Sequence, residues 1–383
     1  MEYKYLIFTD TNEELRYSSK IQCIPNVLTG ETKTLKIKIG SEENVPYATT
    51  NVQDNYAYFE SIAFSVWSIL PQCEVVLEFD ELKWNEHFPV NYNFYEKTIE
   101  DELKQKKKTI TSAIQHYMRF LYRVMNMKRQ YNKLFHVDEG NKSAVEKFEK
   151  EFDKAIIEKK FRITSPQNKS NIKHTDKISE NHLEKWFVMN SEKGIISKKI
   201  PDYSRFGEMI LFDQFPCGLF YEDKNEENRI FNKGAFDLWG ITSNEEICLF
   251  ELKKDGNCSL GIISELFFYS CLMKDFKQIT SGVSDKDILK IRGFNSFLKA
   301  KDEKINAYFL VPRFHSFIEN HLQGILIAMN SRNNKDIIYG YIKFNQNNLW
   351  KGIDEKKFMN LVEEEWDERQ KRLKDGDRTE DKL

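Results

Sequence analysis

Two acidic residues and a lysine near the middle of the chain have the types and spacing for metal-assisted chemistry. Glu251 and Lys253 end a dense apolar segment, Ile247 to Leu252, which is typical of a strand buried on both faces. Residues two apart on a strand point to the same face of the sheet. Asp237 belongs to the strand expected just before, so a short turn would bring its carboxylate close to that of Glu251.

Such a pair of carboxylates predicts a site for a hard cation. Oxygen ligands suit Mg²⁺, for which Mn²⁺ can substitute. Asp237 and Glu251 are the predicted ligands, and Leu252, between Glu251 and Lys253, is also predicted to contact the metal. Lys253 would position the attacking water or offset charge in the transition state. The predicted reaction is metal-dependent hydrolysis of a phosphodiester bond.

The tripeptide Glu-Leu-Lys identifies nothing by itself, because it occurs three times, beginning at Glu81, Glu102 and Glu251. The copy at Glu102 lies in a charged helical region, where it reads as a solvated face. The copy at Glu81 follows a strand, but no strand carrying Asp precedes it. Only the third copy has an Asp-bearing strand before it and a helix after it. The alternative for this copy is a cross-strand ion pair at a charged strand end.

Hydrophobic periodicity predicts a mixed α/β protein around these residues. Expected strands are 3–8, 20–24, 34–39, 73–79, 208–212, 236–241, 247–253, 305–311 and 337–344; expected helices are 58–70, a long one from 96, 143–159, 179–189, 260–276 and one after 312.

The predicted domain organisation has four parts. Residues 1–163 form an α+β accessory domain, strand-rich over 1–95 and helical over 96–160. A polar segment, 164–177, lacks periodicity and is the expected linker. The α/β domain that carries the site spans 178–365. The almost wholly charged tail, 366–383, is expected to fray or stay disordered.

With this order of elements, residues 179–345 resemble the PD-(D/E)XK nuclease superfamily, closest in style to its NucS-like and RecB-like members. In that superfamily a helix carrying Glu precedes a strand with Asp, a strand ending in (D/E)xK, and a helix. GAFDLWGI supplies Asp237, with Phe236 in place of the usual proline. The resemblance implies a restriction-endonuclease-like fold, a mixed sheet flanked by helices.

The resemblance also implies further site residues. Glu180 and Glu184, one turn apart, are both candidates for a third acidic ligand; Glu184 is preferred because it lies deeper in the helix. RecB-like members carry Gln-x-x-x-Tyr on the helix after the lysine. Tyr269 fits that pattern, whereas Glu265 stands where the glutamine is usual, so its role stays open. The alternative for Tyr269 is packing on the apolar face of the helix.

Composition narrows the function classes. Of the 383 residues, 40% are apolar and 31% charged, as in a soluble globular protein, and no stretch approaches the roughly 20 apolar residues of a membrane span. Six scattered cysteines without a CxxC pair, and no signal peptide, favour a cytoplasmic location. The sequence contains no phosphate-binding loop motif of the kind that would indicate an ATPase. Two runs, 104–108 and 127–133, concentrate basic residues; a solvated helix face is favoured over phosphate contact.

These observations lead to one leading hypothesis and two alternatives. The leading one is a Mg²⁺-dependent deoxyribonuclease whose N-terminal domain recognises DNA, a partner or an activating signal, or mediates homo-oligomerisation. A nuclease domain fused to an unfamiliar module resembles bacterial anti-phage defence proteins. One alternative is a nuclease-like scaffold that binds nucleic acid or a partner without cleaving. The other is a ribonuclease, because a metal site does not distinguish the sugar.

Overall fold

The structure, a computed structural model, describes residues 3–18, 21–40, 58–81, 103–164, 177–207, 209–226, 228–231, 234–255, 259–280, 291–301, 304–331, 336–350 and 352–374, with the side chains of 103–114 left aside. These residues form a mixed α/β protein with four sheets, which confirms the predicted class. None of the helices that they build is long and apolar enough to cross a bilayer.

A five-stranded mixed sheet lies at the centre of the part that carries Asp237 and Glu251. Its strand order is β15 (Ile337–Lys343), β14 (Ile305–Val311), β13 (Ile247–Leu252), β12 (Ala235–Ile241) and β9 (Ile210–Pro216). β13, β14 and β15 are parallel, whereas β12 runs antiparallel to both of its neighbours. The strand β13 therefore stands where the parallel and antiparallel parts of the sheet meet.

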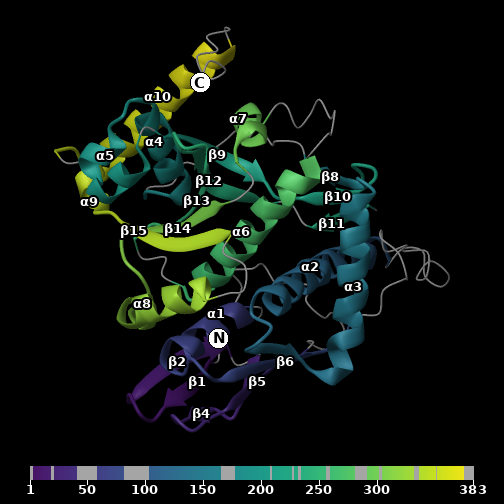
Figure 1. The fold of residues 1–383 in the computed structure, drawn as a ribbon. Helices are drawn as coiled ribbons and strands as arrows, with labels where there is room; N and C mark the ends of the chain where they lie inside the picture. The colour runs from purple at the N-terminus through teal and green to yellow at the C-terminus, as the bar shows by residue number, and fades with distance from the viewer. Residues whose placement is uncertain are drawn as a thin grey trace.

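Both faces of this sheet are covered, which explains why β13 is buried throughout. The side chains of Ile247 and Leu249 pack with α6 (Gly261–Thr280) and α8 (Ser316–Asn330) in one apolar cluster. Those of Cys248, Phe250 and Leu252 point the other way, toward α4 (Glu180–Glu192) and α10 (Glu355–Lys374). Figure 1 shows the two pairs of helices on opposite sides of the sheet.

The N-terminal half contains two small sheets and three helices. One sheet has the order β2 (Glu13–Ser18), β1 (Tyr3–Phe8), β4 (Val27–Leu28), and the other has β3 (Ile21–Ile24), β5 (Thr34–Ile39), β6 (Glu74–Phe79), β7 (Phe135–Val137). The helices are α1 (Phe59–Ile69), α2 (Leu103–Gln130) and α3 (Glu139–Ile157). A fourth sheet joins the halves, because β10 (Leu219–Tyr221) pairs with both β8 (Phe161–Ile163) and β11 (Arg229–Phe231).

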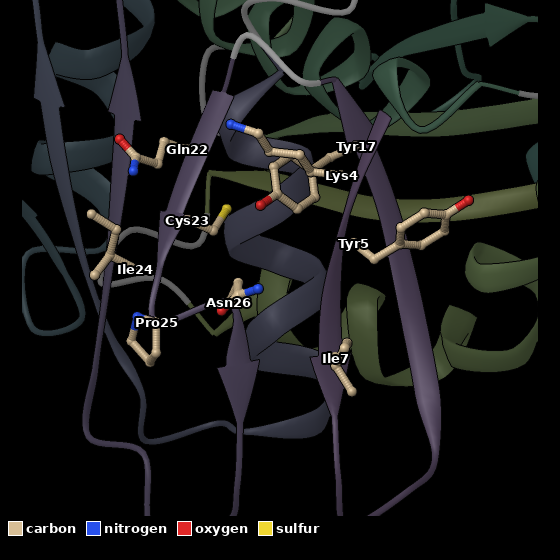
Figure 2. A pocket seen from close by; sticks show the side chains of 9 residues that line it. All are labelled: Lys4, Tyr5, Ile7, Tyr17, Gln22, Cys23, Ile24, Pro25 and Asn26. Atoms are coloured by element: carbon tan, nitrogen blue, oxygen red, sulfur yellow. The ribbon is translucent and has the colours of Figure 1, made fainter. Parts of the chain in front are cut away.

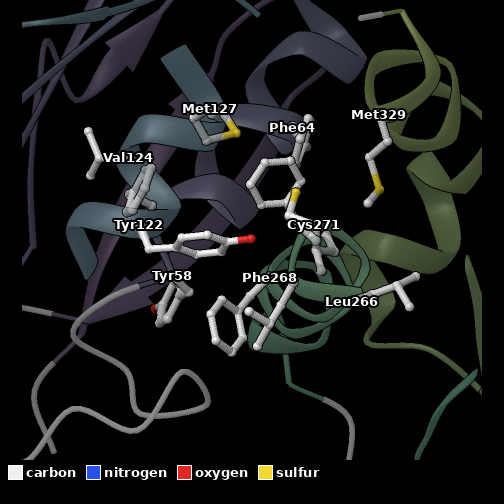
Figure 3. Packing of buried hydrophobic residues seen from close by; sticks show 14 of the residues in the cluster. Tyr58, Phe64, Tyr122, Val124, Met127, Leu266, Phe268, Cys271 and Met329 are labelled. Atoms are coloured by element: carbon white, nitrogen blue, oxygen red, sulfur yellow. The ribbon is translucent and has the colours of Figure 1, made fainter. Parts of the chain in front are cut away.

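The two halves also share a single apolar cluster. Figure 3 shows Phe64 from α1 and Tyr122 from α2 beside Phe268 and Cys271 from α6. The accessory part is therefore packed onto the helix that follows β13, and its apolar core continues into that of the α/β part. Of the expected linker, residues 165–176 lie outside the described part of the chain.

Smaller elements complete the chain: α5 (Ile196–Lys199), the 3-10 helix η2 (Pro201–Phe206), α7 (Phe294–Lys299) and α9 (Gln346–Leu349). Of the expected elements, most are confirmed within two residues. The helix α3 begins at Glu139, four residues before its expected start, because Asp138 caps it by accepting the Gly140 N–H. The strand β9 extends to Pro216 rather than 212.

Other expectations also differ from the structure: α4 ends at Glu192 and α6 at Thr280, three and four residues beyond their expected ends. The helix expected over 58–70 forms, but α1 is buried on all sides from Phe59 to Trp67 rather than on one face, because it lies between the two halves. The helix α10 continues to Lys374, so nine residues of the expected charged tail are helical; Arg369 is buried there and binds Glu192. The start expected at 96 for the long helix lies outside the described residues.

Candidate active site

Asp237 and Glu251 lie side by side where β12 and β13 separate. The ladder between these strands ends with Leu238 opposite Phe250. Beyond it, the backbone N–H of Leu252 donates a hydrogen bond of 3.0 Å to Oδ2 of Asp237. The carboxylate thus replaces the missing ladder partner of Leu252, which fixes Asp237 against the end of β13. This is the arrangement expected from the hairpin.

Lys253 follows directly and turns its ammonium back into the protein. Its Nζ lies 2.5 Å from Glu251 Oε1 and 4.0 Å from Asp237 Oδ2. The side chains of Glu251 and Lys253 are only 2% and 6% exposed, whereas that of Asp237 is 19% exposed. Asp237 is therefore the edge of the cluster that solvent reaches, with the other two groups behind it.

The helix α6 adds Glu265 and Tyr269, one turn apart. Oε2 of Glu265 lies 3.3 Å from Lys253 Nζ, and its side chain is 2% exposed. Within the described part of the chain this oxygen accepts no hydrogen bond of good geometry. The ring of Tyr269 packs edge-on against Phe236, with centroids 5.1 Å apart. Burial, followed by the charges of nearby acidic groups, raises the pKa of Tyr269 well above its usual value.

Burial dominates the electrostatics of the carboxylates. It raises the pKa of Asp237 to about 6, although the ammonium of Lys253 acts in the opposite direction. Burial, together with the charges of Asp237 and Glu265, raises the pKa of Glu251 well above its usual range. For Lys253 burial acts to lower the pKa, but three surrounding carboxylates outweigh it and the pKa is raised. The lysine therefore stays charged among acids that ionise reluctantly.

The structure separates the two candidates for a third acidic residue. The charge of Glu180, at the first position of α4, acts on both Asp237 and Lys253 and raises the pKa of each. Glu184 is 6% exposed and accepts a hydrogen bond of 2.5 Å from the side-chain amide of Gln214. Glu180 is thus the one that the structure associates electrostatically with the site, although the position of Glu184 in the helix favoured it from the sequence.

His182 lies between these glutamates in the sequence. It is buried, 1% exposed, at the start of α4. Its Nδ1 is 2.7 Å from the hydroxyl of Ser179 and its Nε2 3.2 Å from Glu363 of α10. Burial lowers its pKa. The histidine therefore caps the helix and joins it to α10.

Two residues near the site were not singled out by the sequence. Gln214 lies across from Asp237 on β9, in a left-handed backbone conformation with φ of 56°, where the ladder between β9 and β12 is interrupted. Residues other than glycine rarely adopt this backbone conformation, and those that do cluster at functional sites. Arg119, from α2, is 7% exposed, and burial lowers its pKa against the opposing effect of Cys217 and Tyr269. Neither residue belongs to a recognisable motif.

The other acid–base patterns have different surroundings. Glu81 accepts a 3.3 Å hydrogen bond from Asn141, and residues 82, 83 and 102 and the side chain of Lys104 lie outside what the structure describes. The basic run 104–108 likewise has no described side chains. In the second run, Lys128 and Arg129 both bind Glu149 of α3. Those two charges are therefore paired with an acidic residue of α3.

The site combines oxygen donors with a buried cation. Among the described residues, no three acidic, histidine or cysteine side chains are already grouped as metal ligands. The ammonium of Lys253 contacts both Glu251 and Glu265. The donors that face the cluster are nevertheless carboxylate oxygens, the ligands that Mg²⁺ and Mn²⁺ prefer.

Comparison of the chain with protein-family models, with curated proteins and with solved structures gives no match. The residues of the site themselves are therefore the basis for a function.

Proposed function

We propose that the protein is a metal-dependent nuclease of restriction-endonuclease-like fold that hydrolyses DNA. The observation that carries this proposal is the convergence of Asp237, Glu251 and Lys253 at the end of β13, with Glu265 behind them. A structural ion pair at a strand end would need one acid and one base. Here three carboxylates surround one lysine, two of them almost wholly buried, and two have raised pKa values. Perturbed carboxylates of this kind cluster at functional sites.

The residues fit a divalent cation. Asp237 and Glu251 would hold it, with the backbone of Leu252 beside them. Glu265 supports the fit, because its buried Oε2 accepts no hydrogen bond of good geometry from the described atoms. When bound, the cation would polarise the phosphoryl oxygen and lower the pKa of an attacking water.

The remaining residues have separate roles in this proposal. Lys253 would offset negative charge that develops on the phosphate, and its raised pKa keeps it protonated for this task. Glu265 would orient that ammonium from α6 through their 3.3 Å ion pair. Tyr269 would keep its proton and donate a hydrogen bond, because its pKa is raised. Glu180 would add negative charge near Asp237 and favour cation binding.

DNA is the proposed substrate and anti-phage defence the proposed setting, both following from the resemblance to PD-(D/E)XK nucleases. Purified protein is incubated with supercoiled plasmid, linear DNA and RNA, in Mg²⁺, in Mn²⁺ and in EDTA. We expect metal-dependent cleavage of DNA that is lost in Asp237→Ala and in Lys253→Ala. The matched control is Asp202→Asn, an exposed acid of η2.

The results of this assay distinguish a deoxyribonuclease from a ribonuclease and from a scaffold that does not cleave. Cleavage that continues unchanged in both site variants would refute the proposal, and cleavage of RNA alone would reassign the substrate. Wild-type protein that binds DNA but cleaves no substrate in either metal would identify a scaffold.

A further inference from the structure

A groove on the N-terminal half lies between two strands of different sheets. It has a volume of about 540 Å³, within the range of about 300–1,000 Å³ common for ligand sites. β1 lines it on one side and β3 on the other, joined by Pro25 and Asn26. Figure 2 shows the Tyr17 hydroxyl and the Cys23 thiol pointing toward one another across this space.

Both strands present an open edge to the groove within the described part of the chain. β4 pairs with β1 only at Ile7 and Phe8, so the segment from Tyr3 to Leu6 has no ladder partner on that side among these residues. The strand β3 is the end strand of its sheet and pairs with β5 alone. Backbone donors and acceptors on such edges form hydrogen bonds readily with an added strand.

The position of an added strand is already defined by β4. That short strand runs parallel to β1, with Ile7 N–H bonded to the Asn26 carbonyl at 2.9 Å and Thr9 N–H to the Leu28 carbonyl at 3.0 Å. Continuing in line with β4 toward Tyr3, a strand of about four to six residues would lie between β1 and β3. It would join the two small sheets into one.

The side chains around the groove indicate what such a strand would carry. Tyr5 and Ile24, on its two walls, are 45% and 43% exposed, and two large apolar side chains exposed at one groove suit an apolar partner. Among the described residues that line the groove, Lys4 is the charged one, and it is exposed. At the base, the Tyr17 hydroxyl and the Cys23 thiol are buried and close enough to hydrogen bond.

We propose that this groove binds an extended peptide segment of a partner protein, with alternating apolar and acidic side chains, as an added strand between β1 and β3. The backbone would be recognised by the two open edges, the acidic side chain by Lys4, and the apolar ones by Tyr5 and Ile24. The proposal is independent of the nuclease proposal, since the groove lies in the half of the chain that does not carry Asp237.

The test uses a pool of fluorescein-labelled heptapeptides, acetylated and amidated, alternating Val, Ile or Phe with Asp or Glu. We expect saturable fluorescence polarisation below about 1 mM with the full chain. A pool with alternate backbone amides N-methylated should not bind, because it cannot donate to the strand edges. The N–H of Tyr5 faces the same side of β1 as those of Ile7 and Thr9, so its hydrogen exchange should be fast in the free protein and slowed by the acidic pool.

Charge reversal tests the recognition of the acid. Lys4→Glu should weaken binding of the acidic pool about fivefold and strengthen binding of a pool with Lys in place of Asp and Glu. The matched control is Lys150→Glu, at an exposed position of α3, which should change neither. No binding of either charged pool at 1 mM would overturn the proposal, as would equal binding of the N-methylated pool. An amide at Tyr5 that is already protected in the free protein would also overturn it, as would strand pairing with a second copy.

Discussion

Replacing Asp237 with asparagine should make the protein more stable while abolishing its proposed activity. Asparagine has nearly the same shape, and its side-chain oxygen can accept the Leu252 N–H bond now made by Oδ2 at 3.0 Å. The ionised aspartate, by contrast, is held where burial disfavours its charge, and its pKa is raised from 3.8 to about 6. The neutral amide removes that unfavourable term.

The magnitude follows from linkage between protonation and folding. A carboxyl whose folded pKa is raised binds protons more tightly in the folded state, so its ionisation destabilises the fold as pH rises from the unfolded to the folded pKa. For Asp237 the loss accumulates between pH 3.8 and about 6 and is constant above. The full difference corresponds to about 3 kcal/mol, an upper bound because the side chain is 19% exposed. At pH 5 about half of this loss in the free energy of unfolding is present.

Urea denaturation at pH 5 and pH 8 measures both values. Asp237→Asn should gain up to about 3 kcal/mol at pH 8 over the native chain, and about half of that gain at pH 5. Asp202→Asn, at an exposed acid, should change neither by more than about 0.5 kcal/mol. A gain equal at the two pH values, or a loss of stability at pH 8, would refute the reasoning.

Three further predictions concern other charged residues, two of them at the site and one in the contact between the halves. Lys253→Met should lower the free energy of unfolding by about 3–5 kcal/mol in urea at pH 8, because it removes the cation among three carboxylates; an unchanged midpoint would contradict this. In cleavage assays, Glu180→Gln should slow the reaction about tenfold, whereas Glu184→Gln should change it less than about twofold; the reverse order would favour Glu184 as the third acid. Glu60→Leu and Arg123→Met should each cost about 3–5 kcal/mol, and the double variant should recover most of the loss; strictly additive losses would count against a buried pair.

The elements around the candidate site could be predicted from the sequence because their signals are local. Beside the site, the apolar run Ile247 to Leu252 forms the strand that its pattern indicates. In the N-terminal half, the alternating segment Thr34 to Ile39 does the same. The convergence of Asp237 with Glu251 followed from the short connection between two neighbouring strands, which leaves few arrangements. The mixed α/β class was predictable for the same reason.

What the sequence did not indicate depends on contacts between distant segments. Glu180 and Glu184 lie one turn apart on the same face of α4, so the sequence pattern does not distinguish them. Only their contacts with other segments do. Gln214 has no distinguishing neighbour in the sequence, and only pairing with β12 reveals its unusual backbone conformation. The short strands β8 and β10 are three residues each and gain stability from pairing between the halves, which no local pattern encodes.

Contact between the halves bears directly on the site. Ser264, the residue before Glu265, donates a hydrogen bond of 3.0 Å to Glu60 of α1, and that carboxylate is paired with Arg123 of α2. Ser61 of α1 donates to the carbonyl of Leu260 at 2.7 Å, just before α6 begins. All of these polar side chains are buried. The start of α6 is therefore held against the N-terminal half by hydrogen bonds at Leu260 and at Ser264. Because Lys253 is held in turn by Glu265, the orientation of its ammonium depends on helices that no sequence pattern connects with the site.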